Sequence, residues 1–490
     1  MSEQHVLHIS ANPWAIAAFA GYLIAVIGVG VYASRFASQG ITEFFLGGRK
    51  LKSFVVALSA VTSGRSAWLI VGVTGMAYTR GPSAVWSVVG YIVVELFMFL
   101  TVAVKLRHHT GAMNDVTLSD FFESRFGDSR NLLRTASSII ILLFMVIYVA
   151  AQFDAGGKTF SASFGMTHFE GVLMTAFIVW AYTLLGGFLA VALTDVVQAF
   201  FMLTGLIVLP VIAVMDFGGV SAVLNSVESQ DPLLLDWFAL GFGALVGFLG
   251  IGFGSTGNPH IIVRYMSIED PRLLRRSAVY GTVWNVLMAA GAILIGIAGR
   301  AYFPDHSVLP NADTENLFPY LAQLHLHPFL FGLVIAAILA AIMSTADSQL
   351  LVATSSVVRD VYQKLLLKGK YIDQRKLVQL SRIMISVLVV AAIGLRELAS
   401  DLVFWLVLFA WGGLGASFGP ALILSLYWKG VTKWGVLAGF VSGTTVTIIW
   451  NQIPALKNAM YELVPAFLIS TILVIIVSKL TTITTSDISE

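Results

Sequence analysis

A group of oxygen-bearing side chains lies inside an apolar stretch of the chain that runs from Phe329 to Ala353. Within it, residues 341–349 read Ala-Ile-Met-Ser-Thr-Ala-Asp-Ser-Gln. On a helix, Ser344, Thr345, Asp347 and Ser348 would converge on one side. A carboxylate inside a bilayer costs roughly 2.5–3.5 kcal/mol on insertion scales, so it is seldom kept without a use. Because hydroxyl, carboxylate and carbonyl oxygens bind hard cations, the segment predicts an ion site in a transporter.

The element that holds this segment must be a membrane helix. The chain has 490 residues, of which 57% are hydrophobic and only 11% are charged, and its mean hydropathy is +0.85. A soluble protein would carry about 25% charged residues. The sequence contains no cysteine, which excludes disulfides and thiol catalysis. It also lacks a zinc motif, a nucleophile elbow and a phosphate-binding loop, so we expect neither an enzyme nor an organic cofactor. The net charge of +2 gives no indication of nucleic-acid binding.

Thirteen apolar segments are long enough to span a bilayer. They lie near 13–34, 53–78, 82–104, 133–160, 168–186, 188–215, 236–262, 276–301, 327–358, 378–396, 400–427, 433–452 and 459–480. With the N-terminus outside, the inner loops and adjoining span ends hold 23 of the 29 Lys and Arg residues, Arg264 among them, and the outer loops hold 4. The excess of positive charge on the inner side therefore predicts an outer N-terminus and an inner C-terminus, in a multi-pass protein of the cell membrane.

Two of these segments are interrupted by small and polar residues. The interruptions lie at Ser59–Ala67 in the second segment and at Gly250–Pro259 in the seventh. Residues 53–215 and 236–427 can then be read as two repeats of five helices, each of which begins with a broken helix. Because five is odd, the second repeat would be inverted in the membrane, and paired broken helices point to a binding site at mid-depth. Residues 433–480 would add two helices to this single domain of residues 1–490.

Several motifs, in this order, resemble the sodium/solute symporter family, and within it the sodium/proline symporters. They are Phe45–Arg49, Ser66–Trp68, Thr117–Phe122, Gly186–Gln198, Asn258–Ile261, Ala341–Thr345 with Ser348–Leu351, and Ala410–Pro420. The resemblance implies an all-α fold of the LeuT type, with 5+5 inverted repeats and extra helices at both ends. It also implies Na+ as the coupling ion and a small organic solute, most similar to the amino acid proline.

The resemblance also implies particular site residues. A principal sodium site would use the carbonyls of Thr62, Arg65 and Ala341 and the hydroxyls of Ser344 and Thr345. Some members have a second cation site, which here would use Asp195 with Asp347 and Ser348; alternatively, Asp195 caps a helix or pairs with a basic residue. The solute would contact a set of residues around the two breaks: Arg65, Ser66, Trp68, Tyr148, Gln152, Ile251 and Ser255.

Three departures from the family pattern concern the solute. Sodium/proline symporters typically read Ser-Asp-Met-Ser-Gly-Trp where residues 63–68 read Ser-Gly-Arg-Ser-Ala-Trp. Ile251 and Ser255 replace a Trp and a Tyr, which leaves room for a larger solute. Gln152 stands where a small residue is common, and it could bind solute or bridge helices.

Arg65, the cation gained at the first break, allows two readings. It could bind a solute carboxylate with two hydrogen bonds, or weaken the dependence on sodium. It could instead form a buried ion pair with Glu95 or Asp154, two acids that the usual pattern lacks, and so determine which helix faces meet.

The leading hypothesis is therefore a sodium-coupled symporter. The alternative is a sodium-independent or proton-coupled transporter of a larger or anionic solute. A solute sensor would need a signalling domain, and the segment after Lys479 is only a short polar tail. A monomer in the lipid bilayer is expected.

Overall fold

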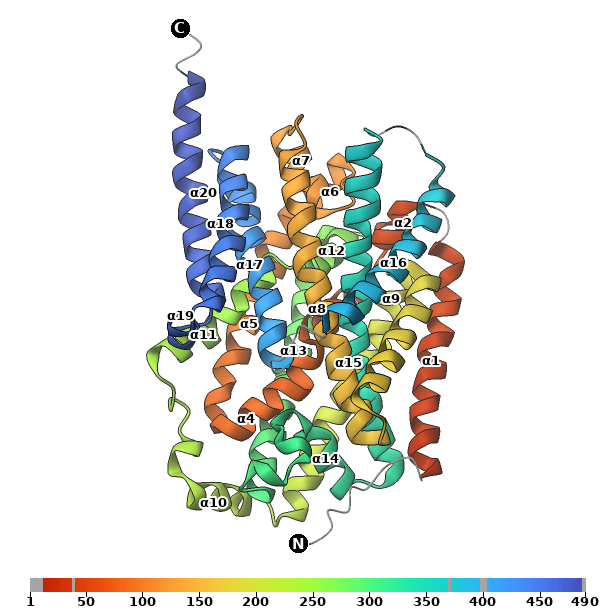
Figure 1. Cartoon of the computed structure of the whole chain (residues 1–490), viewed down its shortest axis with the longest axis vertical. Helices are drawn as coiled ribbons and strands as arrows, with labels where there is room; N and C mark the ends of the chain where they lie inside the picture. Colours follow the sequence, from red (N-terminus) through yellow and green to blue (C-terminus); the bar gives the residue numbers. More distant parts are fainter. Residues whose placement is uncertain (1–11, 38–39, 369, 371, 397–402, 487–490) are drawn as a thin grey trace.

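The computed structural model describes residues 12–37, 40–368, 370, 372–396 and 403–486. Over these residues the chain is built from helices that run roughly along one axis (Figure 1). Nine helical stretches of the described chain are long and apolar enough to cross a membrane. The longest uninterrupted helices are α1 (Pro13–Ala37), α8 (Leu132–Phe164), α13 (Leu274–Tyr302), α15 (Pro328–Ser355), α16 (Gln374–Arg396), α17 (Val403–Tyr427), α18 (Lys433–Gln452) and α20 (Leu463–Ser486).

All thirteen predicted segments overlap helices of the described chain, although residues 400–402 of the eleventh segment lie outside the described residues. The five segments that do not coincide with one of these long helices are bent, broken or joined. The stretch Ser53–Met113 contains two of them, separated by a 3-10 turn at Gly81–Ala84. Helix α9 (His168–Asp216) contains two more, because Gly187 adopts φ 56° and divides it. A Cβ atom at Gly187 would lie 2.9 Å from the carbonyl oxygen of Phe44, so both the backbone conformation and the close contact require glycine there.

Both interruptions predicted from small and polar residues are breaks in the helices. The first divides α3 (Ser53–Ala67) from a π-helical turn at Trp68–Val73 and from α4 (Thr74–Arg80), with Ser66 at φ 51°. The second divides α11 (Phe242–Gly250) from α12 (Pro259–Ser267) through a 3-10 turn at Ile251–Thr256. Glycine, serine and proline disfavour a continuous helix at these places, and non-helical backbone is tolerated at membrane depth when protein encloses it.

The shorter helices occupy the two ends of the molecule or link the long ones. They are α2 (Ile41–Leu46), α5 (Val85–Phe97), α6 (Ala103–Met113), α7 (Leu118–Phe126), α10 (Val220–Gln230), α14 (Leu317–His325), α19 (Pro454–Ala459) and a π-helical extension of α15 at Ser356–Leu366. Helices α10 and α14 lie at the end where α1 begins, and α7 lies at the opposite end (Figure 1). We call the first the outer end and the second the inner end, as the loop charges indicate.

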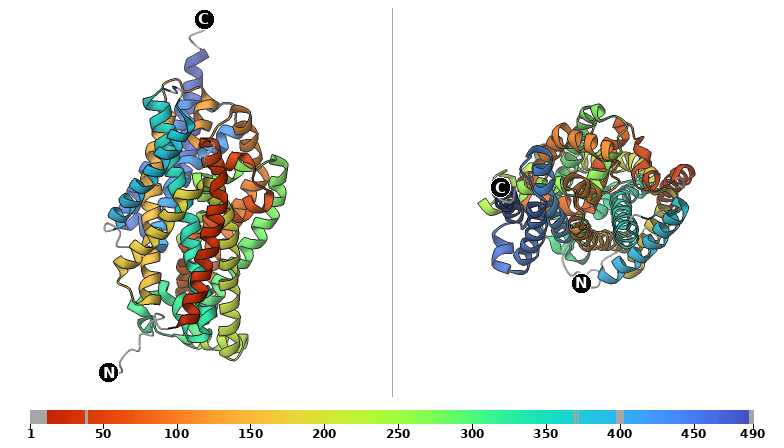
Figure 2. Two further views of the ribbon diagram at one scale, coloured as in Figure 1. Left: turned by 90° about the vertical axis from the view of Figure 1, so that its right-hand side faces the viewer. Right: turned by 90° about the horizontal axis from the view of Figure 1, so that it is seen from above.

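Helix α15 lies at the centre of the bundle and packs against α1, α3, α8 and α9. The extra helices α18 and α20 pack on each other on the side away from α1 (Figures 1 and 2). The predicted repeats, residues 53–215 and 236–427, correspond to α3–α9 and α11–α17. Both begin with a broken helix, and both breaks lie within the packed interior.

The inner halves of the two broken helices are joined by their backbones. Just before α3, the N–H of Leu51 donates to the carbonyl of Ser267 at 3.2 Å. The N–H of Glu269 donates back to the carbonyl of Leu51 at 3.0 Å, which makes a short parallel bridge. An exposed ion pair between Lys52 and Glu269 accompanies it. The inner ends of α3 and α12 are therefore one connected unit.

Candidate functional site

The first break frees backbone groups that are normally paired within a helix. The N–H of Ala67 donates to the Gln152 side-chain oxygen of α8 at 3.2 Å, and the N–H of Trp68 lies 3.1 Å from the hydroxyl of Ser66. On the other side of the break, the carbonyls of Thr62 and Ser63 face α15. These groups are fully or almost fully buried. The break therefore presents carbonyl oxygens to a neighbouring helix inside the protein.

Helix α15 meets these carbonyls with its hydroxyl groups. The Ser344 hydroxyl lies 3.1 Å from the carbonyl of Ala341 and 3.4 Å from that of Thr62. The Thr345 hydroxyl lies 3.0 Å from the carbonyl of Ser63 and 3.1 Å from that of Ala341. Three carbonyls thus face two hydroxyl groups that carry one hydrogen each, so acceptor capacity remains for a hard cation. The donor set fits Na+, and we call these five oxygens the carbonyl–hydroxyl site.

Four of the five predicted sodium ligands lie together in this site. The fifth, the carbonyl of Arg65, accepts instead from the N–H of Trp68, and the carbonyl of Ser63 is placed next to Thr345. The sequence does not indicate that the Ser63 carbonyl takes the place predicted for the Arg65 carbonyl, because consecutive carbonyls at a helix break point in different directions.

Two of the three residues of the predicted second cation site, Asp195 and Ser348, contact a guanidinium group. Asp195 of α9 accepts from Arg264 of α12 at 3.0 Å, and also from Ser59 at 2.6 Å and Ser63 at 3.2 Å. Ser348 accepts from the same Arg264 nitrogen at 2.5 Å. The charge pattern predicts Arg264 among the basic residues of the inner loops and span ends, whereas its side chain is fully buried. Asp195 is therefore paired with a basic residue, as the alternative interpretation of this residue predicted.

Asp347, the third residue of the predicted second cation site, is bonded to Tyr182 and Ser348 and not to Arg264. Its carboxylate accepts from the hydroxyl of Tyr182 at 2.6 Å and from that of Ser348 at 2.9 Å. Asp347 is fully buried, and both of these partners are uncharged hydroxyls. Through Ser348 it is one hydroxyl group away from Ser63 and from the carbonyl–hydroxyl site.

Arg65 is held in a buried polar network at the first break. Its guanidinium pairs with Glu95 of α5 and donates to the side-chain oxygen of Asn285 at 2.7 Å. Asn285 donates in turn to Glu95 at 2.6 Å, and the guanidinium lies over the Tyr91 ring at 3.6 Å from the ring centre. Asp154, the other predicted partner, lies instead 3.2 Å from His168 and 3.7 Å from Arg396, so the expected pairing of Arg65 with Asp154 is corrected.

A small cavity lies between the two breaks. Four of the predicted solute residues line it, namely Arg65, Trp68, Tyr148 and Ile251. The cavity has five further wall residues: Gly64, Tyr91, Val407, Leu408 and Trp411. Of these, Trp411 lies within one of the motifs on which the family resemblance rests. The walls are mostly aromatic and aliphatic, and the one charged wall residue is balanced by Glu95.

The remaining predicted solute residues, Ser66, Gln152 and Ser255, serve the breaks themselves or lie beside them. Ser66 and Gln152 accept hydrogen bonds from backbone N–H groups, as described above. The Ser255 hydroxyl is buried, and within the described chain it has no hydrogen-bond partner.

The second break is held by close packing and by neutral hydrogen bonds. The Asn258 side chain donates to the carbonyls of Gly254 at 2.8 Å and Trp411 at 3.2 Å. The Trp411 ring donates to the carbonyl of Ile251 at 2.8 Å. A Cβ atom on Gly254 would lie 1.7 Å from the Trp411 ring nitrogen, and one on Gly252 would lie 2.2 Å from the carbonyl oxygen of Gly90. Only glycine allows this approach.

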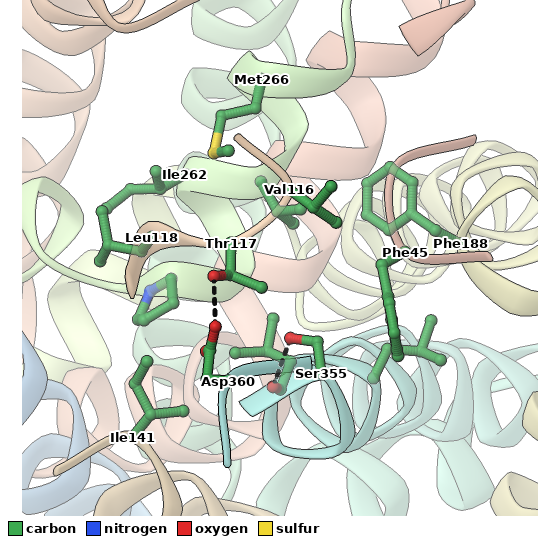
Figure 3. Close-up of a pocket in the computed structure, with 14 residues that line it drawn as sticks. Phe45, Val116, Thr117, Leu118, Ile141, Phe188, Ile262, Met266, Ser355 and Asp360 are labelled. Carbon is green, nitrogen blue, oxygen red and sulfur yellow. Dashed lines mark hydrogen bonds between the residues drawn. The ribbon is translucent and has the colours of Figure 1, made fainter. Parts of the chain in front are cut away.

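Further cavities lie on both sides of the central one. On the outer side, Ile251 and Leu408 also line a cavity of about 380 Å³ whose other walls include Arg80 and Trp405. On the inner side, a second small and mainly apolar cavity lies between α12 and the inner part of α15 (Figure 3). The central and outer cavities thus share two wall residues.

The inner cavity ends at a cluster of charged side chains. Arg134 of α8 pairs with Asp120 at 2.7 Å, with Asp360 at 2.5 Å and with Glu123. Asp360 also accepts from the Thr117 hydroxyl at 2.8 Å (Figure 3). Burial raises the pKa of the nearby Asp115 carboxyl to about 6. The cluster joins α7, α8 and the inner extension of α15.

Comparison with known proteins gives one consistent picture. Residues 44–443 match the model of the family described as the sodium:solute symporter family. Sodium/proline symporters of Staphylococcus aureus, strains JH9 and NCTC 8325 / PS 47 among them, are 37% identical over 484 residues, which cover 96% of this chain and 94% of the relative.

Two solved structures are similar in fold. One is a Na+-coupled sialic acid symporter in a substrate-bound, outward-open state, with a TM-score of 0.81 and 19% identity over 96% of this chain and 98% of that one. The other is Mhp1, a transporter of the nucleobase-cation-symport-1 family, with a TM-score of 0.56 and 12% identity over 89% and 94% of the two chains. The architecture is therefore that of a LeuT-type transporter.

Proposed function

This chain belongs to the sodium:solute symporter family, and from that membership we propose that it couples the entry of Na+ to the uptake of proline or a closely similar small amino acid. The protein is a multi-pass membrane transporter and not an enzyme. Its family supports sodium-coupled symport, and the identity of the solute is the finer part of the proposal.

The observation that carries the coupling is the carbonyl–hydroxyl site. Na+ would be held by the carbonyls of Thr62, Ser63 and Ala341 and by the hydroxyls of Ser344 and Thr345. A cation there would draw the inner half of the first broken helix onto α15, because its ligands come from both. The same broken helix supplies Arg65 and Trp68 to the solute cavity, so either ligand would favour the arrangement that binds the other, and their affinities rise together.

The cavity supports a solute that is small and has no net charge. Its walls are aromatic and aliphatic apart from Arg65, and the Glu95 carboxylate already compensates that guanidinium. An anionic solute would have to compete with Glu95 for Arg65, whereas a zwitterionic amino acid brings no net charge into the cavity. The 37% identity to sodium/proline symporters favours proline within this class.

Uptake of radiolabelled proline into proteoliposomes tests the proposal. We expect an inward Na+ gradient to drive accumulation and a K+ gradient of equal size to fail. Ser344→Ala and Thr345→Ala each remove one oxygen from the cation and should weaken the apparent affinity for Na+ by about tenfold or more, which corresponds to about 1.4 kcal/mol. Thr204→Ala is a matched control, because that hydroxyl bonds only within its own helix at the surface.

The competing function is sodium-independent or proton-coupled transport of an anionic solute, which the position of Arg65 on the cavity wall would favour. Uptake that follows a pH gradient and is indifferent to Na+ would support it and reject sodium coupling. Competition assays with neutral, cationic and anionic amino acids then separate the solute classes.

A further inference from the structure

Arg264 is a fully buried cation that the proposed transport cycle does not use. It lies on α12, in the inner half of the second broken helix. Its guanidinium donates to Asp195 at 3.0 Å, to the hydroxyls of Ser59 at 3.0 Å, Ser63 at 2.6 Å and Ser348 at 2.5 Å, and also to the carbonyl of His260. One side chain thus gathers oxygens from α3, α9, α12 and α15.

These oxygens are the ones that a second cation would need. A hard cation binds oxygens at about 2.3–2.6 Å, and one Arg264 nitrogen already lies within 3.0 Å of Asp195, Ser63 and Ser348. The guanidinium also keeps its positive charge under all conditions that the protein meets. A sodium ion on the same oxygens would therefore meet both steric overlap and Coulomb repulsion.

The charges around the carbonyl–hydroxyl site agree with this arrangement. Asp195 is neutralised by Arg264, while Asp347 is hydrogen-bonded to two uncharged hydroxyls. Asp347 is therefore the carboxyl group of this neighbourhood that has no basic partner among the described residues. The second oxygen of Asp195 is buried and, among the described residues, has no hydrogen-bond partner, so Asp195 retains capacity for another ligand. It is the charge of Arg264 that opposes a second cation here.

We propose that Arg264 is the resident cation of the Asp195 site, and that the chain consequently binds a single exchangeable Na+. The inference rests on the proposed function, since it takes the carbonyl–hydroxyl site to be the exchangeable one. Arg264 donates to the Ser63 hydroxyl, while the carbonyl of the same residue accepts from Thr345 in the carbonyl–hydroxyl site. Arg264 forms no hydrogen bond with the five oxygens of the carbonyl–hydroxyl site.

Equilibrium binding of radioactive sodium to the purified full-length chain tests this without any solute. The unaltered protein should bind one Na+ per chain with a Hill coefficient near one. Arg264→Gln vacates the oxygens around Asp195 and leaves its charge unbalanced, so this variant should bind two Na+. Arg264→Lys restores the charge and should return the number to one. The double variant Asp195→Asn with Arg264→Gln removes both charges and should also bind one.

The outcomes separate the inference from the proposed function. The proposed function, and the inference with it, would be overturned if the unaltered protein bound no Na+. The same would follow if the Ser344→Ala variant bound Na+ as well as the unaltered protein does. Two Na+ bound by the unaltered protein would overturn the inference alone and leave sodium coupling intact. One Na+ bound by a folded Arg264→Gln variant would likewise overturn it. If Arg264→Gln does not fold, the count on the unaltered protein and on the charge-balanced double variant decides the matter.

Discussion

The two broken helices are interrupted at equivalent places in their repeats, but different interactions stabilise the two breaks. The first turns at the single residue Ser66, and charged and polar groups hold it: the Arg65–Glu95 pair, Asn285 and the amide of Gln152. The second is spread over Ile251–Asn258 and is neutral, and glycines packed against neighbouring backbone and the Trp411 ring hold it. One break therefore depends on matched charges and the other on the absence of side-chain atoms. Substitutions that damage one should spare the other.

The largest expected effect is at the first break. Glu95→Gln leaves the Arg65 guanidinium buried without a counter-charge, which should lower the free energy of unfolding by about 3–5 kcal/mol. Thermal unfolding of the purified protein in detergent measures this loss. Replacing both partners, Arg65→Met with Glu95→Met, should recover most of it, because a buried pair gives little net stability. Equal stability of Glu95→Gln and the unaltered protein would show that charge does not hold this break.

At the second break, adding one methyl group should be enough to cause damage. Gly254→Ala forces the Cβ against the Trp411 ring and should cost about 1–3 kcal/mol, since overpacking displaces neighbouring side chains. Because Trp411 lines the solute cavity, proline uptake should fall as well. Gly394→Ala in α16 is the matched control: it meets open space and should leave both quantities nearly unchanged. A normal melting temperature and uptake for Gly254→Ala would contradict the packing argument.

The smallest effect distinguishes backbone conformation from side-chain bonding at Ser66. Its φ of 51° favours glycine, while its hydroxyl lies near the N–H of Trp68. Ser66→Ala loses the hydroxyl and keeps the strained conformation, so we expect it to be less stable than Ser66→Gly by about 1 kcal/mol. Melting temperatures of the two variants, measured side by side, give the order. The reverse order would mean that backbone conformation has no influence at this turn.

The local composition predicted where the two helices break, but it did not predict which residue pairs with Arg65 at the first break. Glycine and serine mark both interruptions and a proline also marks the second, and these residues are weak helix formers whatever surrounds them. The choice between Glu95 and Asp154 for Arg65 depends on how α5 and α8 are rotated, which no local pattern records. Both acids are compatible with the sequence, and packing selects Glu95.

Arg264 shows a second limit of sequence reasoning. It stands at the end of a span next to inner-loop charges, so a count of basic residues assigns it to the loop. Its partner Asp195 lies 69 residues away in the chain, and only the fold brings them together. The hydroxyl face of α15 was easier to find, because helical spacing alone aligns Ser344, Thr345 and Ser348. Side chains that lie on the same face of one helix can thus be predicted from the sequence more easily than contacts between side chains of different helices.

The bridge between Leu51 and residues 267–269 is made entirely of main-chain groups. Every amino acid except proline supplies the N–H and carbonyl that it needs, so most substitutions there leave it unchanged. Substitutions at the residues that line the cavity between the breaks therefore leave this link between the inner ends of α3 and α12 in place. The two broken helices are thus connected through main-chain groups, separately from the side chains that would determine which solute binds.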